Sequence, residues 1–149
     1  MSKSTLNITN KRANFEFSLM LKFTAGIMLT GSEIKSIRAG NVNLTDAFCF
    51  FKDDELWLKN MHIGQYKQAA HYNHEPLRNR KLLLNKSEIR KLQSKLREKG
   101  LTIVPTRMWI AETGFAKIEI ALAKGKKSFD KREDIKKRDS DRELKRSEI

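Results

Sequence analysis

The sequence predicts a mainly β fold, a small antiparallel barrel with inserted helices. A period of two runs through Phe15, Phe17, Leu19, Leu21 and Phe23, which is typical of a strand buried on one face. Shorter strand patterns recur along the chain, separated by turn residues, and no βαβ unit with a glycine fingerprint is present. A chain of 149 residues is the size of one domain. We therefore expect about six antiparallel strands rather than an α/β sheet.

The chain begins with strands and a short helix. Gly26 interrupts the first alternation, so residues 27–29 are expected to form a second, short strand. Thr30 and Glu33 have the spacing of a capping box, which predicts a helix that ends at Gly40.

A hairpin and a long irregular stretch follow. Residues 47–51 and 56–59 flank a polar turn and are predicted to pair. Residues 62–81 have little periodicity and contain Pro76. A connection of that length in a compact domain is usually functional or mobile.

The second half contains an amphipathic helix. Asn85 and Glu88 predict its start and Gly100 its end, and its apolar stripe consists of Ile89, Leu92 and Leu96. Its other faces carry Lys86, Arg90, Lys91, Lys95, Arg97 and Lys99. For any single one of these cations, a solvated position is the simplest interpretation.

A last strand pair completes the body. Strands are predicted over residues 101–110 and 115–123, with an edge position or a bulge at Pro105. The whole set of elements fits an OB-like barrel, an architecture that often binds oligonucleotides.

The composition changes at Lys124 and divides the chain into a body, residues 1–123, and a tail, residues 124–149. From residue 130 to the end, 15 of 20 residues are charged, and the few apolar ones define no face that could pack on a core. The tail is expected to be disordered alone. Pairs such as Glu133–Lys137 would support a helix once a partner supplies further contacts.

The charge balance indicates a polyanionic partner. Lys and Arg total 31 against 18 Asp and Glu, which gives a formal net charge of +13. Such an imbalance makes a compact body repel itself, and a polyanion relieves the repulsion. Nucleic acid is the first candidate and an anionic membrane surface the second.

The sequence is expected to carry neither a membrane span nor a signal peptide. No apolar run approaches the ~18 residues of a membrane span, and residues 1–11 lack the apolar segment of a signal peptide. Cys49 is the single cysteine, which excludes an intramolecular disulfide and fits a reducing compartment. We expect a cytoplasmic protein without a membrane partner.

Candidate catalytic and metal-binding residues form no recognisable motif. His62, His71 and His74 lie in or beside the irregular stretch without a cysteine pair, so packed or solvated histidines are favoured over a zinc site. Cys49 stands among phenylalanines and is expected in the core. Phosphate-binding loops and nucleophile motifs are also missing. The chain is expected to be no enzyme and to need no cofactor.

One group of basic residues differs from a solvated face. Arg78, Arg80 and Lys81 follow the long irregular stretch and precede the cap of a basic helix, a setting that fits phosphate binding by structured RNA. Tyr66 and Tyr72 could stack on unpaired bases nearby or pack on the body.

Seven segments, in order along the chain, carry a more specific signal. The longest is Gly-Ser-Glu-Ile-Lys-Ser-Ile-Arg-Ala-Gly at residues 31–40, and the others fall at residues 10–13, 60–63, 73–78, 80–85, 99–102 and 125–132. Together they resemble the signatures of the SmpB family of bacterial tmRNA-binding proteins. Phe129 departs from the His or Tyr common in that family, and Asn79 from a proline.

The resemblance implies an adaptor in trans-translation. Such a protein binds the tRNA-like domain of tmRNA, supports its aminoacylation and delivers alanyl-tmRNA, with EF-Tu and GTP, to stalled ribosomes. The tail would enter the empty mRNA channel of the small subunit, which ribosomal RNA lines, and fold there as a helix. The nascent chain is then tagged for degradation.

The resemblance also assigns site residues. For tmRNA, it implies contacts at Glu33, Leu84 and Asn85, with support from Lys11, Arg12, Lys35 and Arg38, beside the loop cations Arg78, Arg80 and Lys81. For the decoding centre, the tail residues are Lys126, Lys127, Phe129, Asp130, Lys131, Arg132, Lys136, Lys137 and Arg138. The capping box alone explains Glu33 equally well, and the two roles can coexist.

Two alternatives remain open from the sequence. A structural RNA-binding protein of ribosomal type would explain the charge, the size and the tail. An RNA-processing enzyme would require RNA turnover, which we expect to be absent.

Overall fold

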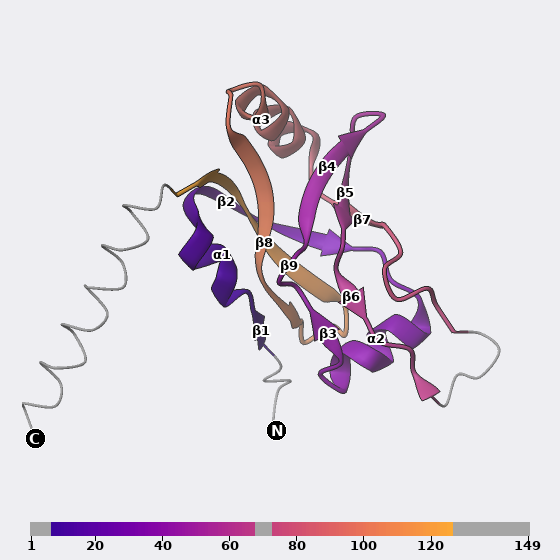
Figure 1. The fold of residues 1–149 in the computed structure, drawn as a ribbon. Helices are drawn as coiled ribbons and strands as arrows, with labels where there is room; N and C mark the ends of the chain where they lie inside the picture. Colours follow the sequence, from indigo (N-terminus) through magenta and orange to yellow (C-terminus); the bar gives the residue numbers. More distant parts are fainter. Residues whose placement is uncertain (1–6, 68–72, 127–149) are drawn as a thin grey trace, which may run out of the picture.

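The computed structural model describes residues 7–67 and 73–126, which form nine strands and three helices (Figure 1). In chain order they are β1 (Asn7–Thr9), α1 (Lys11–Glu16), β2 (Phe17–Ile27), α2 (Gly31–Arg38), β3 (Val42–Asn43), β4 (Phe48–Lys52), β5 (Glu55–Lys59), β6 (His62–Ile63), β7 (Arg80–Leu83), α3 (Lys86–Leu96), β8 (Leu101–Ile110) and β9 (Ala116–Gly125).

Six of the strands close into a ring. The hydrogen-bonded order runs β8, β4, β5, β7, β2 and β9, and β9 pairs again with β8. Every pairing is antiparallel, and β1 adds to β8 at the side of the ring. Strands β3 and β6 form a separate two-stranded sheet. The predicted mainly β barrel with inserted helices is confirmed.

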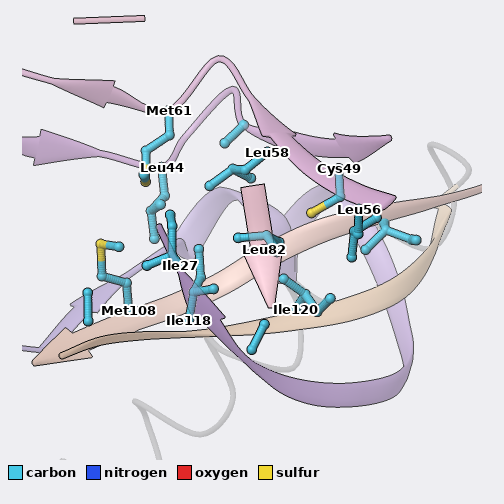
Figure 2. Packing of buried hydrophobic residues seen from close by; sticks show 14 of the residues in the cluster. Ile27, Leu44, Cys49, Leu56, Leu58, Met61, Leu82, Met108, Ile118 and Ile120 are labelled. Carbon is cyan, nitrogen blue, oxygen red and sulfur yellow. The ribbon is translucent and has the colours of Figure 1, made fainter. Parts of the chain in front are cut away.

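The core fills the inside of this ring (Figure 2). Alternate residues of each strand point inward, among them Leu56, Leu58 and Leu82, and all three are buried. Cys49 lies in the same cluster, where burial raises the pKa of its thiol well above the ordinary value. The thiol is therefore a core group, as the sequence predicts.

The two predicted helices form with the predicted caps. The side chains of Thr30 and Asn85 each accept a hydrogen bond from the backbone N–H of a glutamate three residues on. The carboxylate of that glutamate accepts a hydrogen bond from the backbone N–H of the cap residue. Leu92, from the apolar stripe of α3, is fully buried. Among the described residues no helix is long and apolar enough to cross a membrane.

The first part of the chain differs from the sequence-based prediction. Residues 11–16 form helix α1, so the strand begins at Phe17 rather than at Phe15. The Asn10 side chain caps this helix by accepting from the Ala13 N–H. Strand β2 then runs through Gly26, which pairs with Leu83 on one side and Lys117 on the other, so the predicted strand break is wrong. Residues 28–29 lie outside any strand.

The turns agree with the sequence in detail. Asp53 and Asp54, at the tip of the β4–β5 hairpin, both have positive φ values, 52° and 61°, as in a type I′ turn. The register between β8 and β9 shifts between Pro105 and Arg107, which confirms a bulge. Strand β9 continues two residues beyond its predicted end, to Gly125.

Candidate RNA interface

The centre of the candidate site is an ion cluster that joins α2 to the start of β7. The Glu33 carboxylate accepts from Arg78 Nη2 through Oε1 and from Arg80 Nε through Oε2, each at 2.5 Å. Its Oε1 also accepts from the Thr30 N–H at 2.8 Å. The capping box thus fixes the carboxylate in the orientation that both arginines need.

Arg80 holds three chain segments together. Its Nη1 donates to the Met61 carbonyl at 2.7 Å and its Nη2 to the Pro76 carbonyl at 3.1 Å. With Glu33, these bonds connect α2, the turn after β5 and the loop before β7. The planar guanidinium suits this task because its donors point in fixed directions.

Burial and pairing set the ionisation of the pair. Burial alone raises the pKa of the Glu33 carboxyl, but hydrogen bonds from Arg78, the Thr30 N–H and Arg80 outweigh it and leave the pKa below its ordinary value. Burial lowers the pKa of Arg80, and the bond to Glu33 opposes that shift. The carboxylate is therefore held as an anion between two cations.

The burial of Arg80 corrects its predicted role. The Glu33 and Arg80 side chains are 0% exposed, whereas Arg78 is 37% exposed. A buried guanidinium cannot meet a phosphate at the surface, so Arg80 is a positioning residue and Arg78 the accessible member. Glu33 is also a buried positioning residue. Its negative charge is matched inside the protein by Arg78 and Arg80.

His74 supports the same loop. One ring nitrogen, Nδ1, lies 2.8 Å from Ser32 Oγ on α2, and Nε2 lies 2.9 Å from the Ile63 carbonyl. His74 is buried, which confirms a packed histidine rather than a solvated one. Within residues 7–67 and 73–126, no group of three His, Cys, Asp or Glu side chains could hold a metal.

Asn73 and Tyr66 close the base of the long loop. Asn73 accepts from the Tyr66 N–H at 3.0 Å and donates to the Tyr66 carbonyl at 2.7 Å. The Tyr66 ring lies 5.5 Å from Lys35 Nζ, a cation–π contact with α2. The positioning roles of Ser32, Asn73 and His74 could not be predicted from the sequence, although all three residues lie in family-like segments.

Other predicted residues surround this cluster at the surface. Lys35 and Arg38 are exposed on α2, and Lys81 is half-buried on β7, where it pairs with Glu55. Leu84 packs partly on the core. Asn85 is exposed, but its Oδ1 is occupied by the Glu88 N–H at 3.0 Å and the Ser87 hydroxyl at 2.7 Å.

Lys11 and Arg12 occupy a different part of the body. Both lie on α1, where Arg12 bonds Glu16 at 2.8 Å and Asp46 at 3.2 Å. The hydrogen bond and charge of Glu16, followed by the charge of Asp46, raise the Arg12 pKa. These two cations are not part of the ion cluster around Glu33.

One of the residues predicted to contact the decoding centre, Lys126, lies within the described chain. The Lys126 N–H donates to the Glu16 carbonyl at 2.8 Å, and its Nζ donates to the Asn14 carbonyl at 3.0 Å. Both bonds attach the end of β9 to α1. The other predicted tail residues, Lys127, Phe129, Asp130, Lys131, Arg132, Lys136, Lys137 and Arg138, lie outside the described residues, as do His71 and Tyr72.

Comparisons with known proteins decide the family. The family described as "SmpB protein" matches residues 7–148. The chain belongs to the SmpB family. An SsrA-binding protein of Bacteroides thetaiotaomicron is 53% identical over 146 residues, which cover 98% of this chain and 97% of that protein. One of Flavobacterium psychrophilum is 54% identical over 142 residues, 95% of each chain.

A solved structure supports the SmpB fold. It is described as "tmRNA-SmpB: a journey to the center of the bacterial ribosome", and it matches with a TM-score of 0.71 and 43% identity. The match covers 83% of this chain and 87% of the other. The predicted resemblance to the SmpB family is thus confirmed.

Proposed function

We propose that this protein is an RNA-binding adaptor of trans-translation that binds the tRNA-like domain of tmRNA. Membership of the SmpB family over nearly the whole chain carries the proposal. The basic body and its closed barrel are the physical features that suit a folded, polyanionic RNA.

The proposed tmRNA-binding surface is built around the ion cluster. Glu33 and Arg80 act from inside, where they fix α2 against β7 and hold Arg78 in place. Lys35, Arg38, Arg78 and Lys81 then supply accessible cations around this support. Leu84 and Asn85 adjoin them at the end of β7, and Lys11 and Arg12 form a separate contact on α1.

Later steps follow from the same role. The bound protein supports aminoacylation of tmRNA and travels with alanyl-tmRNA, EF-Tu and GTP to a stalled ribosome in the cytoplasm. There, the tail beyond Lys126 would probe the empty mRNA channel against ribosomal RNA, since residues 124 and 125 end β9 and Lys126 is bonded to α1. No catalytic step is assigned to the protein, so the purified chain should leave RNA intact.

The first test is tmRNA binding by filter retention across a salt series, with bulk tRNA as competitor. The full chain is compared with a truncation after Lys126, because a cut at Ala123 would remove the last two residues of β9 and the bonds of Lys126 to α1. Both forms should bind tmRNA equally and resist the competitor. If both bind tRNA as well as tmRNA and show only a steep salt dependence, the proposed recognition fails.

Copy number separates the adaptor from a ribosomal structural protein. An adaptor should be present at well under one copy per ribosome and should increase on ribosomes when truncated mRNA is supplied. One copy on every 30S subunit, independent of mRNA, would instead favour the structural protein.

A further inference from the structure

The outer faces of β4, β5 and β7 carry a row of side chains of which only Lys81 belongs to the candidate interface. Leu56, Leu58 and Leu82 point into the core (Figure 2), so the residues between them point outward. Phe50 stands opposite Trp57, and Trp57 stands opposite Lys81. The three side chains therefore lie side by side across neighbouring strands.

The two aromatic residues of this row are not core residues. Phe50 and Trp57 are only partly buried, and neither belongs to either buried cluster. The Trp57 Nε1–H edge of the ring is buried and has no hydrogen-bond partner, so it is the rest of the ring that is accessible. Helices α1 and α3 pack against other strands, mainly β2 and β8, and α2 lies next to β6. Part of the Phe50 and Trp57 side chains is therefore exposed on the outer surface of the sheet.

Cations flank the aromatic pair. Lys59 follows Trp57 by two residues on the same face of β5 and is exposed. Lys81 continues the row on β7, and its ion pair with Glu55 neutralises the one carboxylate on that face of β5. The surface consequently combines flat rings with positive charge.

The row leads directly to the candidate interface. Beyond Lys81, the next backbone group is Met28, whose N–H donates to the Lys81 carbonyl at 3.0 Å. The Met28 carbonyl in turn accepts from Arg78 Nη2 at 3.5 Å. An RNA bound at Arg78 and Lys81 would therefore lie next to Trp57, with Phe50 on the strand beyond it.

We propose that Phe50 and Trp57 form a stacking site for unpaired nucleotides of the RNA that docks around α2 and β7. Aromatic rings on a strand face stack on bases of any sequence, and adjacent lysines bind the connecting phosphates. OB-type barrels commonly bind oligonucleotides on a face formed by neighbouring strands. This inference rests on the proposed function, because the docked RNA is the proposed tmRNA. A cross-strand aromatic pair that only stabilises the hairpin is the competing explanation.

Trp57 itself supplies the measurement. In a Trp109→Phe background it is the only tryptophan, and a 12-nucleotide oligouridine should quench its fluorescence with saturation. Inorganic polyphosphate provides the charge without bases and should not quench it. Full-length tmRNA should quench it at a stoichiometric ratio.

Variants then test the stacking itself, by filter retention of oligouridine in the otherwise unchanged chain. Phe50→Leu and Trp57→Leu should each weaken binding about tenfold, the effect of losing one stacked base. Trp57→Phe keeps a ring and should retain most of the affinity. Phe115→Leu is the matched control, since Phe115 is a 70% exposed aromatic residue at the β8–β9 turn and should have no effect.

The outcomes separate this inference from the proposed function. If tmRNA binds with its usual preference but neither it nor oligouridine quenches Trp57, the stacking site is overturned and the adaptor stands. Equal quenching by polyphosphate, or equal effects of Phe115→Leu and Trp57→Leu, would also overturn it. Quenching by oligouridine without preference for tmRNA over tRNA would instead contradict the proposed function.

Discussion

Glu33 Oε2 lies 2.5 Å from Arg80 Nε, and neither side chain is exposed to solvent. The carboxylate comes from the first turn of α2 and the guanidinium from the start of β7, 47 residues later. Arg80 also donates to three backbone carbonyls, those of Met61, Glu75 and Pro76, so its donors are used inside the protein. The pair therefore organises the surface around Arg78 without being part of that surface.

Removal of the carboxylate charge should destabilise the fold strongly. Glu33→Gln leaves Arg80 buried without its counter-ion, and breaking a buried pair in this way costs about 3–5 kcal/mol. Urea unfolding followed by circular dichroism measures the change. Glu75→Gln, an exposed carboxylate in the same loop, should shift stability by less than about 0.5 kcal/mol. A loss below about 1 kcal/mol for Glu33→Gln would contradict a structural role for the pair.

The same carboxyl should make stability depend on pH. Its pKa in the folded protein is lowered, so the stabilisation is complete above the unfolded pKa of about 4.3 and is lost as the pH falls through the folded value. The Glu119 pKa is also lowered: burial alone raises it, but Thr106, Arg107 and Lys22 outweigh that effect. Wild type alone would therefore mix the two contributions.

The difference between wild type and Glu33→Gln isolates the Glu33 contribution. Because the variant cannot gain or lose this proton, the gap in unfolding free energy should be largest at pH 7 and should narrow toward pH 3. Urea titrations at a series of pH values measure the gap. A gap that stays constant over this range would show that Glu33 has the same pKa folded and unfolded.

Gly64 should tolerate no side chain beside Asn41. A Cβ at Gly64 would lie 1.9 Å from Asn41 Nδ2 and 2.4 Å from its Cγ, so one residue must move. Gly64→Ala should cost about 1–3 kcal/mol of stability. Gly31→Ala is the control, because a Cβ there meets nothing within 4 Å and Ala favours the helix. The double variant Asn41→Ala, Gly64→Ala should recover much of the loss, and an additive loss would exclude this contact as the cause.

Asn85 allows capping to be separated from RNA binding. Asn85→Ala should destabilise the protein by about 1 kcal/mol because it removes the α3 cap, whereas Asn85→Ser keeps a capping oxygen. If the amide also contacts RNA, Asn85→Ser should weaken tmRNA binding at unchanged thermal stability. Equal tmRNA binding by Asn85→Ser and wild type would show that Asn85 caps α3 and does not contact the RNA.

Local signals in the sequence were sufficient for most elements of the barrel. The caps at Thr30 and Asn85, the turn at Asp53 and Asp54, and the bulge at Pro105 each depend on a few neighbouring residues. Helix α1 was missed because its cap, Asn10, is fixed by bonds to the Leu44 and Pro105 carbonyls, which are distant in sequence.

The sequence by itself determined most of the strand and helix pattern, the basic character and the resemblance to the SmpB family, because periodicity, capping residues and motif spacing are local properties of a chain. Only the tertiary structure decided which charges are accessible. Arg78, Arg80 and Lys81 are almost consecutive in the sequence. Arg80 nevertheless points into the protein, where it pairs with Glu33, while Lys81 faces outward beside Trp57 because successive residues of a strand alternate. Burial depends on the partner that a distant segment supplies, and that partner becomes a neighbour only when the ring of strands closes.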